Sequence, residues 1–188
     1  MRVIAGKARR LPLKAVPGLD TRPTVDRIKE TLFNILNPYI PGSVFLDLFS
    51  GSGSIGIEAL SRGARKSVFV DNSSKAVSVI EENLAFTKLS DDALVMRKTA
   101  VSAINELGMK KYHFDIVYMD APYQANLEEE TLKALETAGI IDEDTLIVIE
   151  ADKHNTLPFI GESNFSIVRE KDYKNNKHYF LKLGKQTV

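Results

Sequence analysis

Between residues 43 and 150, five short apolar segments are separated by four segments with a helical pattern. The apolar segments are residues 43–48, 66–71, 93–97, 114–120 and 145–150. Parallel strands need long crossover connections, usually helices, and strands buried on both faces have continuous apolar sequences. The alternation therefore predicts an α/β fold in which helices cover both faces of a doubly wound, mostly parallel sheet.

The C-terminal part of the chain has a different pattern. The segments FSIVRE (165–170) and KHYFLKL (177–183) predict two further strands with only a short turn between them, so we expect them to pair antiparallel. The expected fold is a seven-stranded, Rossmann-like open sheet with an antiparallel C-terminal strand. Ligands of such sheets bind beyond the carboxyl ends of the strands. Those ends are Asp47, Asp71, residues 97–100, residues 120–123 and Glu150.

A chain of 188 residues is long enough for one domain with a sizeable core. We expect a single domain over residues 1–188, and a monomer. Residues 1–23 hold several prolines among basic residues and predict an extended arm with at most a short strand pair. Residues 24–42 predict a leading helix and a linker, and residues 43–188 the core.

The charge of the chain is unevenly distributed. Lys+Arg and Asp+Glu both total 25, but the first 30 residues carry eight basic and three acidic residues, which leaves a net charge of −5 for the remainder. A basic arm on a mildly acidic body favours a polyanionic partner such as a nucleic acid. We assign Lys7, Arg9 and Arg10 to phosphate contacts; the alternative is a solvated basic terminus.

Several classes of function are excluded or disfavoured by composition. The chain has no cysteine, which rules out disulfides, thiolate nucleophiles and zinc–thiolate sites. His113, His154 and His178 lack metal-ligand spacing, so we predict no metal and interpret them as structural or surface residues. No apolar run approaches the roughly 20 residues of a membrane span and no signal peptide is evident. The sequence predicts a soluble, cytoplasmic protein without a membrane partner.

The first predicted strand runs into the loop DLFSGSGSIGIEAL (47–60), which contains Gly-x-Gly-x-x-Gly at Gly51, Gly53 and Gly56. Asp71 follows twenty residues after Gly51, so the pattern also matches a dinucleotide-binding fingerprint. Asp47, however, would repel a pyrophosphate and would suit an ammonium or sulfonium group beside an adenosine. Asp71 can accept hydrogen bonds from ribose hydroxyls in either case. The loop therefore favours S-adenosylmethionine over NAD.

A second motif, Asp120-Ala121-Pro122-Tyr123, follows the fourth predicted strand. The exocyclic amine of a base is a poor nucleophile because its lone pair is delocalised into the ring. A carboxylate and an adjacent backbone carbonyl can accept hydrogen bonds from its two N–H groups, which turns the lone pair toward a methyl donor. Proline stiffens such a loop, and an aromatic ring stacks on the base, which has left its own stack. The motif indicates amine methylation, although it also occurs as an ordinary turn.

With these motifs in place, the chain resembles the RsmD-like family of bacterial methyltransferases, which modify a guanine exocyclic amine (N2) in small-subunit (16S) ribosomal RNA. The resemblance covers nearly the whole length. It is carried by MRVIAGKARRLPL (1–13), TRPTVDRIKETLFNIL (21–36), DLFSGSGSIGIEALSRGA (47–64) and the Asp-x-Pro-Tyr loop. The second of these segments is the most specific.

The resemblance implies a class I methyltransferase fold and a set of site residues. S-adenosylmethionine would be held by Arg22, Thr24, Asp47, Phe49, Gly51, Gly53, Asp71, Asn72, Thr99 and Ala100. Arg22 and Thr24 would lie near the methionine end of this cofactor, and Thr99 near its adenine. Asp120 and Tyr123 would hold the guanine, within a catalytic loop that includes Ala121 and Pro122.

The sequence departs from the family pattern at Ala121, where a proline is usual, and at residues 97–100, which lack an acidic residue. It also departs at KDYKNNK (171–177), which contains Tyr173 but lacks the Tyr-Gly common in the family. Three alternatives stay open: an adenine-amine methyltransferase acting on DNA or RNA, a non-catalytic RNA-binding assembly factor, and a disfavoured NAD dehydrogenase. The expected partner is 16S ribosomal RNA, either naked or in an assembling small subunit.

Overall fold

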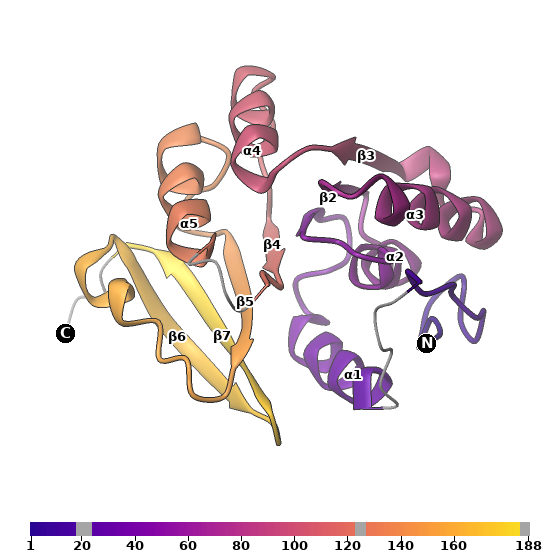
Figure 1. The fold of residues 1–188 in the computed structure, drawn as a ribbon, viewed down its shortest axis with the longest axis horizontal. Helices are drawn as coiled ribbons and strands as arrows, with labels where there is room; N and C mark the ends of the chain where they lie inside the picture. The colour runs from indigo at the N-terminus through magenta and orange to yellow at the C-terminus, as the bar shows by residue number, and fades with distance from the viewer. Residues whose placement is uncertain (18–23, 123–126, 185–188) are drawn as a thin grey trace. The chain divides into compact units, whose positions relative to one another are not determined.

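The structure of the chain is a computed structural model that describes residues 1–17, 24–122 and 127–184 (Figure 1). The chain divides into two compact units, Met1–Thr99 and Ala100–Val188, and each is described by itself. The organisation as a single domain stays a prediction.

The first unit contains the glycine loop and three parallel strands. Its elements are α1 (Thr24–Leu36), β1 (Val44–Leu48), α2 (Ser54–Ser61), β2 (Lys66–Asp71), α3 (Ser74–Thr87), η1 (Ser90–Asp92) and β3 (Ala93–Arg97). β2 pairs in parallel with both β1 and β3. All five residues of β1 are buried, as expected for a strand with both faces covered. The carboxyl ends of the three strands consequently lie along one edge.

The second unit contains the Asp120 loop and a mixed sheet. Its elements are α4 (Ala100–Met109), β4 (Ile116–Met119), α5 (Leu127–Ala138), β5 (Leu146–Asp152), η2 (Pro158–Glu162), β6 (Phe165–Asp172) and β7 (Asn176–Leu183). β4 and β5 are parallel, whereas β7 is antiparallel to both β5 and β6. Figure 1 shows β6 and β7 as the long yellow hairpin at the end of the chain.

The described strands form a seven-stranded sheet with the order β3-β2-β1-β4-β5-β7-β6, which confirms the predicted fold class. Local signals explain the start of α3 and the end of α5. The hydroxyl of Ser73 caps α3 by accepting a hydrogen bond from the amide of Ala76, and Gly139 follows the last residue of α5 at φ +65°. No helix in the described part of the chain is long and apolar enough to span a membrane.

Glycine commonly ends a helix, but α4 continues through Gly108 to Met109. A Cβ atom on Gly108 would lie 2.7 Å from the carbonyl oxygen of Ala138, the last residue of α5. Gly108 therefore lets α4 approach α5 closely, a tertiary reason that a local reading of glycine as a helix stop does not capture.

Candidate functional site

In the first unit, the glycine loop is closed onto the end of β1 by Asp47. The amide of Gly56 donates a 2.9 Å hydrogen bond to Asp47 Oδ2, and the hydroxyl of Ser50 donates one of 2.6 Å to the Asp47 carbonyl. Ser50 also bonds to β2, because its amide donates to the carbonyl of Val70 at 3.0 Å. The Asp47 side chain is only 1% exposed. Asp47 therefore braces the loop from beneath, a role that sequence reasoning missed.

Asp71, at the end of β2, holds the same loop from the neighbouring strand. Its Oδ2 atom accepts a 2.9 Å hydrogen bond from the amide of Gly51, and its Oδ1 atom accepts one of 2.9 Å from the amide of Ser73. A carboxylate has about four lone-pair positions, so these two bonds leave acceptor capacity for ribose hydroxyls. The structure thus brings Asp47, Gly51 and Asp71 together, as the motif predicted.

The backbone of the loop follows an uncommon path. Phe49 has φ 60°, a left-handed conformation that costs a non-glycine residue about 1–3 kcal/mol and occurs preferentially at functional sites. Gly51 and Gly53 have φ 55° and 76°, and a Cβ atom on Gly51 would meet nothing within 4 Å. The open space beside Gly51 is where a ligand can approach the backbone, so these residues fit a nucleoside-type cofactor.

Gly56 allows close packing between α2 and β2. A Cβ atom at this position would lie 2.3 Å from Cε1 of Phe69, inside β2. The third glycine of the motif therefore allows α2 to lie directly against the sheet, which sets where the first turn of α2 begins relative to the loop.

Burial governs the electrostatics of Asp47. Desolvation raises the pKa of its carboxyl to about 7, the hydrogen bond from Gly56 opposes that shift, and the charge of Asp71 adds to it. A cation bound near the loop would favour the ionised carboxylate. Because a carboxyl with this pKa is only partly ionised near neutral pH, its preference for a sulfonium or ammonium group over a pyrophosphate stays a prediction.

The remaining predicted cofactor residues lie at the same strand ends or outside the described residues. Asn72 is exposed directly after β2, Thr99 is exposed after β3, and Ala100 is the buried first residue of α4. Thr24 begins α1, but its side chain lies outside the described part of the structure, as does Arg22. Their roles stay predictions.

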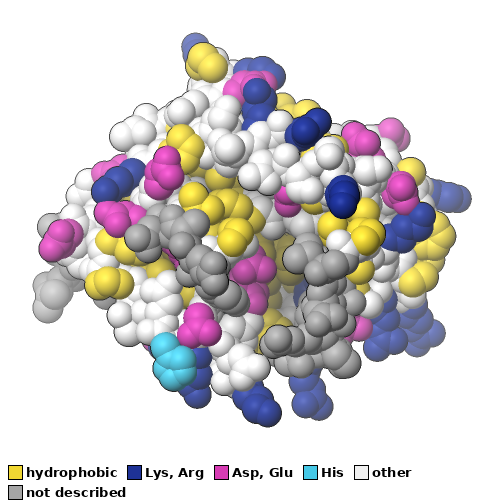
Figure 2. All heavy atoms as spheres, viewed as in Figure 1, with side chains coloured by type: hydrophobic (Ala, Val, Ile, Leu, Met, Phe, Trp, Pro, Cys, Tyr) yellow, Lys and Arg dark blue, Asp and Glu magenta, His cyan; other side chains and the backbone are white. Residues whose placement is uncertain are grey.

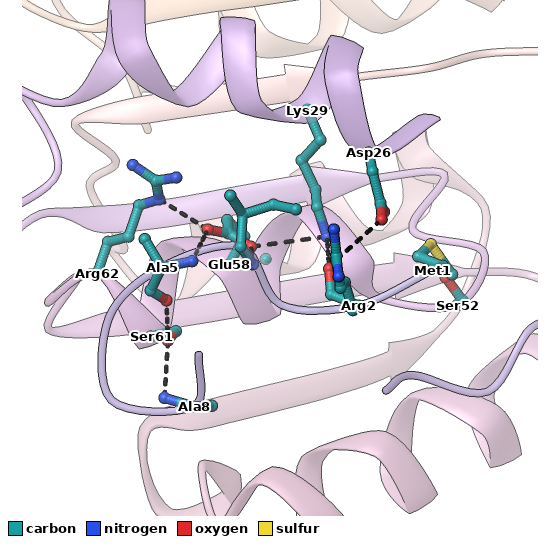
Figure 3. A network of polar contacts seen from close by, with 12 residues as sticks. Met1, Arg2, Ala5, Ala8, Asp26, Lys29, Ser52, Glu58, Ser61 and Arg62 are labelled. Atoms are coloured by element: carbon teal, nitrogen blue, oxygen red, sulfur yellow. Dashed lines mark hydrogen bonds and ion pairs between the residues drawn. The ribbon is translucent and has the colours of Figure 1, made fainter. Parts of the chain in front are cut away.

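The N-terminal arm, residues 1–17, is docked onto α2 (Figure 3). The buried carboxylate of Glu58 accepts hydrogen bonds from the amides of Ile4 (2.7 Å) and Ala5 (3.0 Å). The same carboxylate pairs with Arg62 Nε at 2.7 Å and with Lys29 Nζ of α1 at 3.6 Å. The expected strand pair is only an isolated bridge between Arg2 and Pro12.

Two further contacts anchor the arm. The hydroxyl of Ser61 accepts from the amide of Ala8 at 2.9 Å, and a Cβ atom on Gly6 would lie 1.8 Å from the carbonyl oxygen of Ser61. Asn83 of α3 accepts from the amide of Lys14 at 2.8 Å and donates to the Lys14 carbonyl at 3.0 Å. The arm is therefore an integral part of the first unit, and its buried apolar residues were the overlooked sequence signal: Val3, Ala8, Leu13 and Val16.

The predicted phosphate contacts remain accessible on the docked arm. Lys7, Arg9 and Arg10 are all exposed. Figure 2 shows Lys and Arg side chains gathered at the lower right, over the arm, and acidic side chains interspersed with basic ones elsewhere on this face. Docking fixes where these three charges are presented.

In the second unit, the predicted catalytic loop directly follows β4. Asp120 is exposed, Ala121 is buried with 2% of its surface exposed, and Pro122 is exposed. Tyr123 lies outside the described residues. The structure therefore places Asp120 and the Ala121 carbonyl at the carboxyl end of a strand, where the motif predicted them.

A polar cluster that the sequence did not reveal lies beside this loop. Glu150, in β5, accepts hydrogen bonds from the hydroxyl of Tyr118 (2.6 Å) and from Asn176, and its Oε2 atom lies 2.9 Å from Nε2 of His178. Nδ1 of His178 in turn lies 3.1 Å from the hydroxyl of Tyr173. His178 has 0% of its surface exposed, so of the two predicted locations, structural or surface, the structural one is correct.

A sheet of this order with a braced glycine loop after β1 and an Asp-x-Pro motif after β4 defines a class I S-adenosylmethionine-dependent methyltransferase. Residues 1–182 match a family model described as "Conserved hypothetical protein 95". The chain belongs to this family, and the resemblance to RsmD-like enzymes is confirmed.

Individual relatives are similar to this protein over most of its length. YlbH of Bacillus subtilis is 40% identical over 158 residues, which is 84% of this chain and 86% of the relative. "Ribosomal RNA small subunit methyltransferase D" of Haemophilus influenzae is 38% identical over 174 residues, 91% of this chain and 88% of the relative. The solved structure of yhhF from Escherichia coli covers 99% of both chains with a TM-score of 0.83 and 35% identity.

Proposed function

We propose that this protein methylates the exocyclic amine (N2) of a guanine in 16S ribosomal RNA, with S-adenosylmethionine as methyl donor. One observation carries the proposal: a chain related over 91% of its length to a small-subunit ribosomal RNA methyltransferase presents Asp120, Ala121 and Pro122 at the carboxyl end of β4. A base-amine methyltransferase needs a carboxylate and a fixed carbonyl at that place.

The first unit would hold S-adenosylmethionine along the ends of β1, β2 and β3. The free acceptor capacity of Asp71 suits the ribose hydroxyls, and the open space beside Gly51 suits close approach of the ligand to the loop. Asp47 supports this site through its charge and through its hydrogen bond from Gly56. The cofactor supplies an electrophilic methyl group.

The second unit would orient the nucleophile. The carboxylate of Asp120 and the carbonyl of Ala121 each accept a hydrogen bond from one N–H group of the guanine amine, so that the nitrogen lone pair points away from them. As the new N–C bond forms, positive charge grows on the nitrogen beside the carboxylate, which stabilises it. The product ammonium is acidic enough to lose its proton to water, so no separate base is required.

The docked arm would contact the RNA backbone. Lys7, Arg9 and Arg10 are exposed, and each neutralised phosphate releases counterions, which makes binding dependent on salt. We propose that the enzyme acts as a monomer. The chain carries equal numbers of basic and acidic residues, 25 of each. Because the chain has no net positive charge to draw it to naked RNA, we favour ribosomal RNA already partly covered by protein in an assembling subunit.

The test is nucleoside mass spectrometry of 16S ribosomal RNA, from cells with and without the gene and from reactions with the purified protein. We expect N2-methylguanosine that disappears with the gene. Methylated adenosine as the product would instead establish the adenine alternative, and RNA binding without product would establish an assembly factor.

The role of Asp120 is tested separately with Asp120→Ala. This variant should bind S-adenosylmethionine as the wild type does but transfer no methyl group. Asp144→Ala is the matched control, because Asp144 is an exposed acid that precedes the amino end of β5. Turnover by Asp120→Ala equal to that of the control would contradict the assigned role.

A further inference from the structure

The carboxylate of Glu150 joins three strands of the second unit. Tyr118 belongs to β4, Glu150 to β5, and Asn176 and His178 to β7. Each of the three neighbours contacts the carboxylate, and His178 carries the contact on to Tyr173 in the β6–β7 turn. Glu150 therefore links the carboxyl end of β4 to both β5 and β7.

The cluster keeps Glu150 ionised. Burial raises the pKa of the Glu150 carboxyl, but its contacts with His178, Tyr118 and Asn176 outweigh this and leave the pKa below its usual value. Burial also raises the pKa of the Tyr173 hydroxyl to about 12, and the charge of Glu150 adds to the shift, so Tyr173 keeps its proton. The Tyr173 hydroxyl lies 3.1 Å from Nδ1 of His178.

The cluster lies immediately beside the proposed catalytic loop. β4 contains only four residues, and Asp120 follows it directly. In the parallel register Met119 is level with Ile149, so the next residues along the two strands are Asp120 and Glu150. Tyr118, whose hydroxyl is bonded to Glu150, precedes Asp120 by two residues.

We propose that Glu150 is a positioning residue for methyl transfer: by holding the hydroxyl of Tyr118, it fixes the end of β4 from which Asp120 and the Ala121 carbonyl reach the guanine amine. This inference rests on the proposed function of Asp120. Glu150 itself touches neither RNA nor cofactor in this role. His178 and Asn176 serve by orienting the carboxylate, and Tyr173 serves by contacting His178 from its other ring nitrogen.

The physical reason is the precision that the reaction demands. Two acceptors must bind two N–H groups of one amine at the same time. A displacement of about 1 Å in such an arrangement can reduce the rate about a hundredfold. Asp120 lies one residue beyond β4, after the last residue of the register with β5, so a side-chain anchor two residues before it limits its movement.

The test compares two tyrosine variants that each remove one buried hydroxyl. Tyr118→Phe removes the hydrogen bond to Glu150. Tyr179→Phe, in β7, removes a 2.8 Å hydrogen bond to the carbonyl of Asn155, which follows β5. Both tyrosines are nearly buried, with 3% and 2% of their surface exposed. The two variants should lose similar stability, which thermal unfolding measures.

Their kinetics should differ. We expect kcat to fall about tenfold or more in Tyr118→Phe with an unchanged affinity for S-adenosylmethionine, and to change less than about twofold in Tyr179→Phe. Glu150→Gln, which keeps the size but replaces an acceptor with a donor, should behave like Tyr118→Phe. Equal kcat values for the two tyrosine variants would overturn the proposal.

The outcome can be separated from a failure of the proposed function. The product of the wild-type protein is identified first, by mass spectrometry of the methylated nucleoside. If the wild type methylates guanine N2 and Asp120→Ala does not, the proposed function stands and the tyrosine pair decides the role of Glu150. If the wild type makes no N2-methylguanosine, the proposed function fails, and the tyrosine pair is then compared on whichever methylated nucleoside is formed.

Discussion

The side-chain amide of Asn83 donates a 2.9 Å hydrogen bond to the carbonyl of Ser52, which lies between the two glycines Gly51 and Gly53. The same amide donates at 3.0 Å to the carbonyl of Lys14 in the N-terminal arm. Only 1% of the surface of Asn83 is exposed. One buried side chain of α3 therefore ties the arm to the glycine loop, so the parts proposed to contact RNA and cofactor share a support.

Replacing Asn83 should affect both parts. Asn83→Ala leaves the carbonyls of Ser52 and Lys14 without their partner, which should lower the free energy of unfolding by about 1–3 kcal/mol. It should also weaken binding of S-adenosylmethionine, because the loop loses a fixed point. Isothermal titration calorimetry and urea unfolding measure the two effects.

Glu82→Ala is the control for Asn83. Glu82 precedes Asn83 in α3 and pairs with Lys14 of the same arm, but this ion pair is exposed and should contribute little. Cofactor affinity in Glu82→Ala should equal that of the wild type. If Asn83→Ala also binds the cofactor normally, the loop does not depend on the contact with the arm.

The fold was predictable from the sequence where local pattern decides it. β2 and β3 have the predicted bounds because each is a continuous apolar run between turn residues. β5 ends two residues later than predicted, because Ala151 and Asp152 pair with β7, and that pairing depends on a strand far along the chain. The sequence pattern cannot reveal such a partner.

The site was predictable only in part for the same reason. The motif placed Asp47 and Asp71 beside the glycine loop, but not the burial of Asp47 beneath it. Glu58 and the amide of Ile4 lie 54 positions apart, and His178 and Glu150 lie 28 positions apart. A lone histidine or a glutamate within a helix gives no sign of such contacts until the chain is folded.

The docked arm changes how its contribution to RNA binding has to be tested. Deleting residues 1–16 would remove the buried side chains Val3, Ala8, Leu13 and Val16 as well as the charges, so it should destabilise the first unit and weaken cofactor binding. Lys7→Gln, Arg9→Gln and Arg10→Gln together remove three exposed charges and leave the buried contacts in place.

This triple variant should unfold as the wild type does and bind S-adenosylmethionine normally. The slope of log K for RNA against log[salt] should become shallower by about 2–3, because each lost phosphate contact accounts for about 0.7–0.9. Fluorescence anisotropy at several salt concentrations measures the slope. An unaltered slope would show that the arm does not contact phosphates.

The buried ion pair between Lys29 and Glu58 should be strongly coupled. The side chains are 1% and 0% exposed, and burial lowers the pKa of Lys29 although Glu58 opposes the shift. Glu58→Gln leaves Lys29 without a buried counter-charge and should cost about 3–5 kcal/mol of unfolding free energy. Adding Lys29→Met should recover part of that loss, because it removes the unpaired cation.

A double-mutant cycle by urea unfolding measures this coupling. The exposed pair Lys133–Glu129 in α5 is the reference, since side chains with 72% and 42% exposure are well solvated. Glu129→Gln should leave the unfolding midpoint unchanged. Strict additivity of Glu58→Gln and Lys29→Met would mean that the two buried groups act independently.

Asp47 should make the stability of the cofactor-free protein depend on pH. Burial raises the pKa of its carboxyl from 3.8 to about 7 in the folded protein. Between these values the folded state binds more protons than the unfolded state, so stability falls as pH rises through this window and is level above it. Asp47→Asn keeps an oxygen that can accept from the Gly56 amide but cannot ionise.

The variant should therefore be more stable than the wild type at pH 8, with a difference that shrinks toward zero as pH falls to about 4. It should bind S-adenosylmethionine more weakly, because the loop loses the charge that favours a cationic ligand. Urea unfolding at unit intervals between pH 4 and pH 8, with and without the ligand, measures both effects. A stability difference that stays constant across this range would mean that Asp47 does not titrate there, and unchanged cofactor affinity would mean that its charge does not reach the site.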